Sequence, residues 1–208
     1  FYLSVKLGSP GAVILSYLAQ LPLFLVGLWV GVVPAAIAGA VAAGYLGMGR
    51  DRPPTSVVER QAAAAVGQYQ LMTMFAREFE KCDTVVAQLL MMQDDIEDRR
   101  RFLSARHTMQ ELLSRGILPI VNENDSITTE EIRVGDNDRL AAKVAQMVDA
   151  EDFIILTEVD GLYDRHPDED GAEFIHEVTD VAPFMEATKG KSALGTGGMT
   201  TKLMGANI

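Results

Sequence analysis

Residues 121–138 read V-N-E-N-D-S-I-T-T-E-E-I-R-V-G-D-N-D, and this stretch decides how the chain is interpreted. Two short clusters of acids and amides, at 122–125 and 136–138, follow the apolar run 117–121. Such a run predicts a buried strand, and it would deliver Asn, Glu, Asn and Asp into a loop at the strand's carboxyl end. Ligands bind at that edge in open α/β sheets. The stretch therefore predicts an α/β fold with a polar pocket.

Helical and apolar runs alternate on both sides of this stretch. A long helix is predicted to begin after Thr55 or Ser56 and to run to about residue 81, with Glu59 at capping-box distance from Ser56. Gly116 is a suitable residue to end a second helix. Strands separated by helices predict parallel βαβ units with right-handed crossovers. The remaining expected elements are buried strands at 84–91 and 153–157, a strand at 117–121, an acidic connector at 94–98, and helices at 97–115 and 137–148.

Charge is divided unevenly along the 208 residues, a length that can bury one sizeable core. Residues 1–50 carry only Lys6 and Arg50, which leaves 29 acidic and 16 basic residues in the remainder. A body this acidic argues against a general nucleic-acid surface, which needs clustered Lys and Arg. The lone Cys82 excludes an internal disulfide framework and fits a reducing compartment.

Residues 7–49 form a second anomaly, because these 43 residues carry no charge. As a helix they would extend roughly 64 Å, enough for two crossings of a hydrocarbon layer of about 30 Å. One interpretation is therefore membrane contact through residues 10–48, and the other is an irregular buried core. The hydrophilic break at 50–54 divides the chain into an apolar segment, 1–49, and a second domain, 50–208.

Residues 194–202, L-G-T-G-G-M-T-T-K, form a glycine-threonine loop. Its glycines let backbone N–H groups approach an anion closely, and a lysine at its end supplies a charge for a phosphoryl group. The spacing differs from that of a Walker A loop. Such a loop alone is usually an ordinary turn. Together with the acid-amide clusters it favours phosphoryl transfer to an anionic acceptor, with the two loops facing one crevice.

Six segments then carry a resemblance to a known family. In order and at similar spacing across about 150 residues, they resemble the glutamate 5-kinases of the amino acid kinase superfamily. The segments are E-R-Q-A-A-A-A-V-G-Q (59–68), E-D-R-R-R-F-L-S-A-R (97–106), I-L-P-I-V-N-E-N-D (117–125), V-G-D-N-D (134–138), L-T-E-V-D-G-L-Y (156–163) and L-G-T-G-G-M-T-T-K (194–202).

The resemblance implies a three-layer α/β/α sandwich with a mainly parallel sheet, here truncated at its C-terminus. It also implies phosphorylation of the γ-carboxylate of L-glutamate by ATP, the first step of proline biosynthesis, in a cytoplasmic homo-oligomer that binds no nucleic acid. Mg²⁺ would be held by ATP oxygens and water, with no metal site of the protein's own. The implied residues are Lys6, Asp138 and Lys202 for catalysis; for glutamate, Asp125 at its ammonium group, Asn137 at its carboxylate, and Gly39; and Thr157, Glu158, Thr196, Gly197, Gly198, Met199, Thr200, Thr201 and Lys202 for the nucleotide.

Some positions depart from the family pattern. Ala38 stands where the family's glutamate-binding loop has serine, and Glu158 stands where aspartate is common. The apolar front resembles a bacterial membrane protein more than a kinase. One alternative is therefore an inactive, membrane-anchored kinase-like module or fusion fragment. A kinase for another acceptor, such as aspartate or acetylglutamate, is a further alternative.

Overall fold

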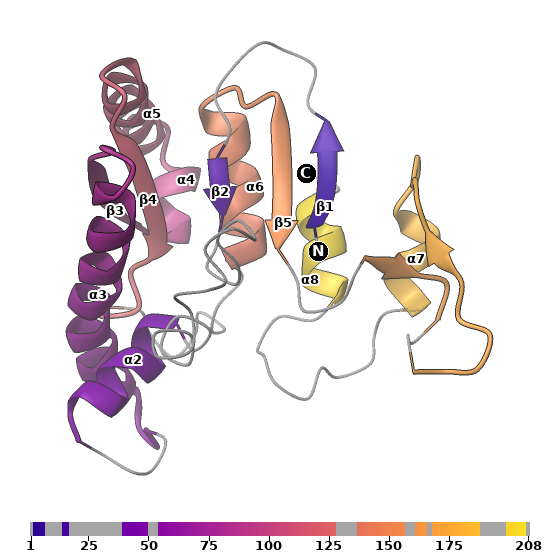
Figure 1. Ribbon diagram of the computed structural model, residues 1–208, viewed down its shortest axis with the longest axis horizontal. Helices are drawn as coiled ribbons and strands as arrows, with labels where there is room; N and C mark the ends of the chain where they lie inside the picture. The colour runs from indigo at the N-terminus through magenta and orange to yellow at the C-terminus, as the bar shows by residue number, and fades with distance from the viewer. Residues whose placement is uncertain are drawn as a thin grey trace. The chain divides into compact units, whose positions relative to one another are not determined.

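The computed structural model describes residues 2–6, 14–16, 39–49, 54–127, 137–156, 161–165, 168–187 and 199–206 (Figure 1). The chain divides into two compact units, which are described one at a time. Unit 1 combines Phe1–Tyr17 with Val134–Ile208, and unit 2 is Leu18–Arg133. Helices and strands occur in both units, so the predicted α/β class is confirmed. The predicted division at residue 50 stays a prediction.

Unit 2 contains the strand predicted to precede the first acid-amide cluster. Strands β3 and β4 pair in parallel, with Val86 opposite Leu118 and Met91 opposite Glu123. The helical crossover between them confirms the expected parallel βαβ unit. The elements are α2 (Gly39–Gly47), α3 (Val57–Glu80), β3 (Val86–Met91), α4 (Gln93–Glu97), α5 (Arg99–Ser114) and β4 (Leu118–Glu123).

Two local expectations in this unit were wrong. Residues 94–98 were predicted as a connector, but most of them form α4, in which the Asp95 carboxylate accepts from the Met92 backbone N–H at 2.7 Å. The strand at 84–91 was predicted to be buried, yet in β3 only Met91 is buried. A two-stranded sheet leaves most side chains of a strand partly exposed, which accounts for the difference.

Helix α3 begins and ends where its sequence predicts. The Ser56 hydroxyl accepts from the Glu59 backbone N–H at 3.2 Å, which satisfies one free donor of the first turn. The Glu59 carboxylate accepts instead from the backbone N–H and hydroxyl of Thr55. In the expected capping box the Glu59 carboxylate would accept from the Ser56 backbone N–H. The structure has this hydrogen bond from the backbone N–H of Thr55, one residue earlier in the chain.

Glycines bring α2 and α3 into close contact. A Cβ on Gly44 would overlap the Ala63 backbone oxygen, and a Cβ on Gly67 would overlap the Ala40 backbone oxygen. The two helices can therefore cross at this distance only because both positions lack a side chain. Ala63, in the Ala-rich start of α3, supplies the backbone oxygen at one of these contacts.

Unit 1 is built around a three-stranded sheet in the order β1-β5-β2 (Figure 1). Strand β5 pairs in parallel with β2 and antiparallel with β1. Phe153 and Ile155 of β5 are fully buried, as are Val144 and Met147 of α6. The elements are β1 (Tyr2–Lys6), β2 (Ile14–Ser16), α6 (Asn137–Met147), β5 (Asp152–Leu156), β6 (Leu162–Tyr163), β7 (Phe174–Ile175), α7 (Ala182–Ala187) and α8 (Met199–Ala206).

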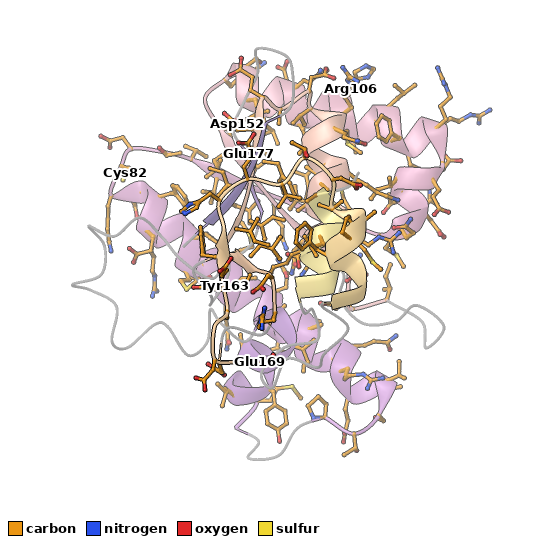
Figure 2. All side chains as sticks on the ribbon, turned by 90° about the vertical axis from the view of Figure 1, so that its right-hand side faces the viewer. Cys82, Arg106, Asp152, Tyr163, Glu169 and Glu177 are labelled. Carbon is orange, nitrogen blue, oxygen red and sulfur yellow. The ribbon has the colours of Figure 1, made fainter. Side chains whose placement is uncertain are left out.

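A small hairpin, β6 and β7, completes the described part of unit 1. The ring of Tyr163, labelled in Figure 2, meets the Phe174 ring edge-on, with centroids 5.5 Å apart. The Asp164 carboxylate accepts from the Glu173 backbone N–H at 2.9 Å. This hydrogen bond and Arg165 lower the pKa of Asp164, with the Arg165 hydrogen bond as the larger cause. The contacts explain a stable hairpin and indicate no reactive site.

The membrane interpretation of residues 10–48 falls mostly outside the described residues. Of that segment the structure describes β2, all of α2 and Met48. In the part of the chain that the structure describes, no helix is both long and apolar enough to cross a membrane.

Candidate functional site

A charged pair joins α6 and α8 in unit 1. The Lys202 ammonium lies 3.3 Å from Asp138 Oδ1 and 3.2 Å from Asp138 Oδ2, although the residues are 64 positions apart in sequence. The side chains are 17% and 15% exposed, so the pair is largely enclosed but still reaches water. Asp138 occupies the first turn of α6, where the helix dipole favours a negative charge. The geometry places one cation where a transferred anionic group could meet it.

The packing beneath this pair fixes its geometry. Helix α8 approaches α6 closely at Gly205, where an added Cβ would lie 3.0 Å from the Asp138 backbone oxygen. Leu203, the residue after Lys202 on α8, is fully buried, and so is Val144 on α6. Because α6 and α8 pack against each other, the ammonium and the carboxylate meet at a contact between two helices.

Asp125 is the predicted ammonium ligand, and it lies in unit 2. It follows β4 in a turn where the Asn124 backbone N–H donates to the Met91 carbonyl at 3.0 Å and the Ser126 hydroxyl donates to Asn124 Oδ1 at 2.6 Å. Desolvation by burial raises the pKa of Asp125. Among the described residues no cation offsets that burial. A bound ammonium group would supply the missing charge.

Within unit 1 the structure brings together two of the predicted catalytic residues. Lys202 and Asp138 meet in unit 1, and Asn137 opens the same helix as Asp138. Lys6 ends β1, with its backbone opposite Asp152. Gly39 is the first residue of α2.

Other predicted residues are described in part or not at all. Met199, Thr200 and Thr201 form the first turn of α8, of which the backbone alone is described. Thr157, Glu158, Thr196, Gly197 and Gly198 lie outside the described residues, so the shape of the glycine-threonine loop stays a prediction.

A buried amide pair in unit 2 was missed. Asn122 belongs to the first acid-amide cluster, and its side-chain Nδ2 donates to Gln68 Oε1 at 2.9 Å. The one sequence signal was that a glutamine interrupts the buried stripe of α3, which otherwise consists of Ala63, Ala64, Gly67 and Leu71. The partner of that glutamine could not be predicted from local spacing.

No metal centre is found in the described ranges, where no three His, Cys, Asp or Glu side chains are grouped to hold an ion.

An amino acid kinase profile matches residues 7–208. The glutamate 5-kinase of Paramagnetospirillum magneticum is 49% identical over 173 residues, which cover 82% of this chain and 46% of that protein. The glutamate 5-kinases of Stutzerimonas stutzeri and Streptococcus suis are 46% and 44% identical, with 46% and 48% of their lengths covered. The chain thus spans about half the length of the curated relatives it matches.

Proposed function

Because the chain belongs to the amino acid kinase family, we propose that it transfers a phosphoryl group from ATP to a carboxylate. The relatives named above support L-glutamate as the acceptor. The product would be glutamyl 5-phosphate, an acyl phosphate that enters proline biosynthesis. A cytoplasmic location and self-association belong to the same proposal, and light scattering tests the second.

The observation that carries this proposal is the enclosed contact between Lys202 and Asp138. Phosphoryl transfer is catalysed mostly by positioning and by neutralising the charge on the transferred group. An ammonium held at a fixed place in a partly dry site neutralises charge better than one in water. We therefore assign to Lys202 the stabilisation of the transferred phosphoryl oxygens.

The chemistry also explains why an aspartate next to this lysine is useful. One oxygen of the glutamate γ-carboxylate attacks the γ-phosphorus of ATP, the bond from that phosphorus to the bridging oxygen breaks, and ADP leaves. A glutamate carboxyl has an ordinary pKa of about 4.3, so the acceptor is already ionised at neutral pH and needs no general base. Asp138 is thus assigned a positioning role, in which it holds the Lys202 ammonium.

Acceptor recognition is assigned to residues whose chemistry matches the ends of an amino acid. The Asp125 carboxylate binds the α-ammonium group, and the raised pKa of Asp125 supports this because a cation would relieve its desolvation. The Asn137 amide binds the α-carboxylate, to which an amide N–H can donate. Gly39, at the start of α2, allows close approach of the substrate to the backbone.

Nucleotide recognition is assigned to the segment before α8 and to the end of β5. Thr157 and Glu158 follow β5 directly, and Thr196 to Thr201 precede Lys202, with Lys6 as a second cation for the phosphates. Mg²⁺ would be held largely by the ATP oxygens and water, and it would neutralise part of the phosphate charge.

The test is ADP release by the full chain with ATP and Mg²⁺, measured with L-glutamate, L-aspartate and N-acetyl-L-glutamate as acceptors. We expect release that depends on L-glutamate and that hydroxylamine traps as glutamyl hydroxamate. Release with another acceptor alone would keep the kinase chemistry but replace the substrate. No acceptor-dependent release would contradict the proposal.

A further inference from the structure

The two buried polar side chains of the described residues bind each other. Gln68 of α3 is 8% exposed and Asn122 of β4 is 3% exposed. Asn122 Nδ2 donates to Gln68 Oε1 at 2.9 Å across 54 residues of sequence. Hydrogen bonds between side chains this far apart and this buried fix the relative position of the elements that carry them. The pair therefore fixes the carboxyl end of β4 against α3.

Stability alone does not account for the glutamine. Within the described residues its Nε2 has no hydrogen-bond partner, so the amide is satisfied on one side only. A buried donor without a partner is costly, and an apolar side chain of the same length would avoid that cost. The amide must therefore contribute something other than folding free energy.

The place of Gln68 on α3 is unusually well defined. It directly follows Gly67, where the backbone of α3 touches the Ala40 carbonyl of α2. Gly44 and Ala63 make the reciprocal contact. If either helix moved along the other, a residue with a Cβ would replace a glycine at the crossing and would clash with the facing backbone oxygen. Gln68 thus connects two parts of unit 2 that the proposed function uses. One is α2, which begins at Gly39, and the other is the turn after β4, which holds Asp125.

We propose that Gln68 is a positioning residue for the amino-acid acceptor, and the inference rests on the proposed function. Its side-chain oxygen holds Asn122, which stands three residues before Asp125, and so sets where the Asp125 carboxylate meets the substrate ammonium. Loss of the amide weakens acceptor binding and leaves nucleotide binding intact.

The test compares KM values for L-glutamate and for ATP in Gln68→Met, which keeps the side-chain length and removes the amide. We expect the KM for L-glutamate to rise about tenfold, which corresponds to about 1.4 kcal/mol, with the KM for ATP within about twofold of wild type. Gln110→Met, at an exposed glutamine on α5, is the matched control and should change neither value.

Two further variants separate positioning from a structural role. Leu71→Ala removes a buried side chain from the same helix, so it should lower the unfolding temperature more than Gln68→Met does and leave the KM for L-glutamate unchanged. Gln68→Glu keeps the acceptor oxygen and the length. Burial raises the pKa of a carboxyl, so the KM for L-glutamate of this variant should move toward the wild-type value as the pH is lowered.

The outcomes are distinguishable. Wild type that turns over L-glutamate, with Gln68→Met equal to it in KM, overturns this inference alone. A KM for L-glutamate that rises as much in Leu71→Ala as in Gln68→Met also overturns it, since the effect would then follow stability. Wild type without glutamate-dependent ADP release overturns the proposed function and this inference with it.

Discussion

The Lys202–Asp138 pair and the Gln68–Asn122 pair differ in charge and in contact with water. Lys202 and Asp138 are charged and about one-sixth exposed, whereas Gln68 and Asn122 are neutral and almost sealed. Burying a charge costs several kcal/mol per ion even when it is paired, but a hydrogen-bonded amide pair is buried at much lower cost. The charged pair is open enough to water for the Lys202 ammonium to contact another anion. The neutral pair instead joins α3 to β4.

The largest expected effect follows from the charged pair. Lys202→Met should lower kcat for glutamate-dependent ADP release by about 10²–10³, since it removes the cation that we propose stabilises the transferred group. Lys81→Met is the control, because Lys81 forms an exposed ion pair with Glu78 at 2.6 Å. Circular dichroism should show both variants folded. A Lys202 variant as active as the Lys81 variant would remove the functional half of the comparison.

The neutral pair should affect stability more clearly than chemistry. Asn122→Leu alone should lower the free energy of unfolding by about 1–3 kcal/mol, because it leaves the Gln68 amide buried without a partner. Gln68→Met alone should lower it less, since it also removes the buried Gln68 Nε2, which has no hydrogen-bond partner among the described residues. The double variant should recover most of that loss, since both polar groups are then absent. Urea unfolding measures this cycle. Strictly additive losses would mean that the hydrogen bond does not join the two positions energetically.

The smallest expected effect concerns Asp125, whose pKa is raised in the folded chain by burial. A raised pKa means that the folded state binds the proton more tightly than the unfolded state. Ionisation therefore costs stability as pH rises from 3.8 through the folded pKa, and the full cost is present at neutral pH. Asp125→Asn should thus unfold at a higher temperature than wild type at about pH 7, while its KM for L-glutamate rises.

That stability difference should shrink as the pH of the unfolding experiment falls toward 3.8. Asp170→Asn, at an exposed turn position, serves as the control and should show no such trend. An Asp125→Asn variant that is less stable than wild type at neutral pH would show that its carboxylate has a favourable partner.

Local signals in the sequence predicted the elements well. Ser56 marked the start of α3, and Gly116, at φ +69°, marked the end of α5. Both depend on hydrogen bonds and backbone geometry within a few residues. The error at α4 also has a local cause. A run of acidic residues is typical of a connector, but here the Asp95 carboxylate accepts from the Met92 backbone N–H and so stabilises the first turn of α4.

Contacts between distant residues were predictable only in part. Asp138 and Lys202 were both singled out through the family resemblance, and the structure places them together. The pairing of Gln68 with Asn122 depends on how α3 packs on the sheet, and no local pattern encodes that packing. The crossing of α2 on α3 was hidden for the same reason, because an uncharged stretch such as 7–49 has no period that identifies its partner.

The most direct test of this account is a double-mutant cycle on kcat for Lys202→Met and Asp138→Asn. Because Asp138 is proposed to act by holding the Lys202 ammonium, Asp138→Asn should lower kcat strongly when Lys202 is present. In the Lys202→Met background the same substitution should change kcat by less than about threefold. Independent losses that multiply in the double variant would contradict the account, because Asp138 would then act on the reaction without Lys202.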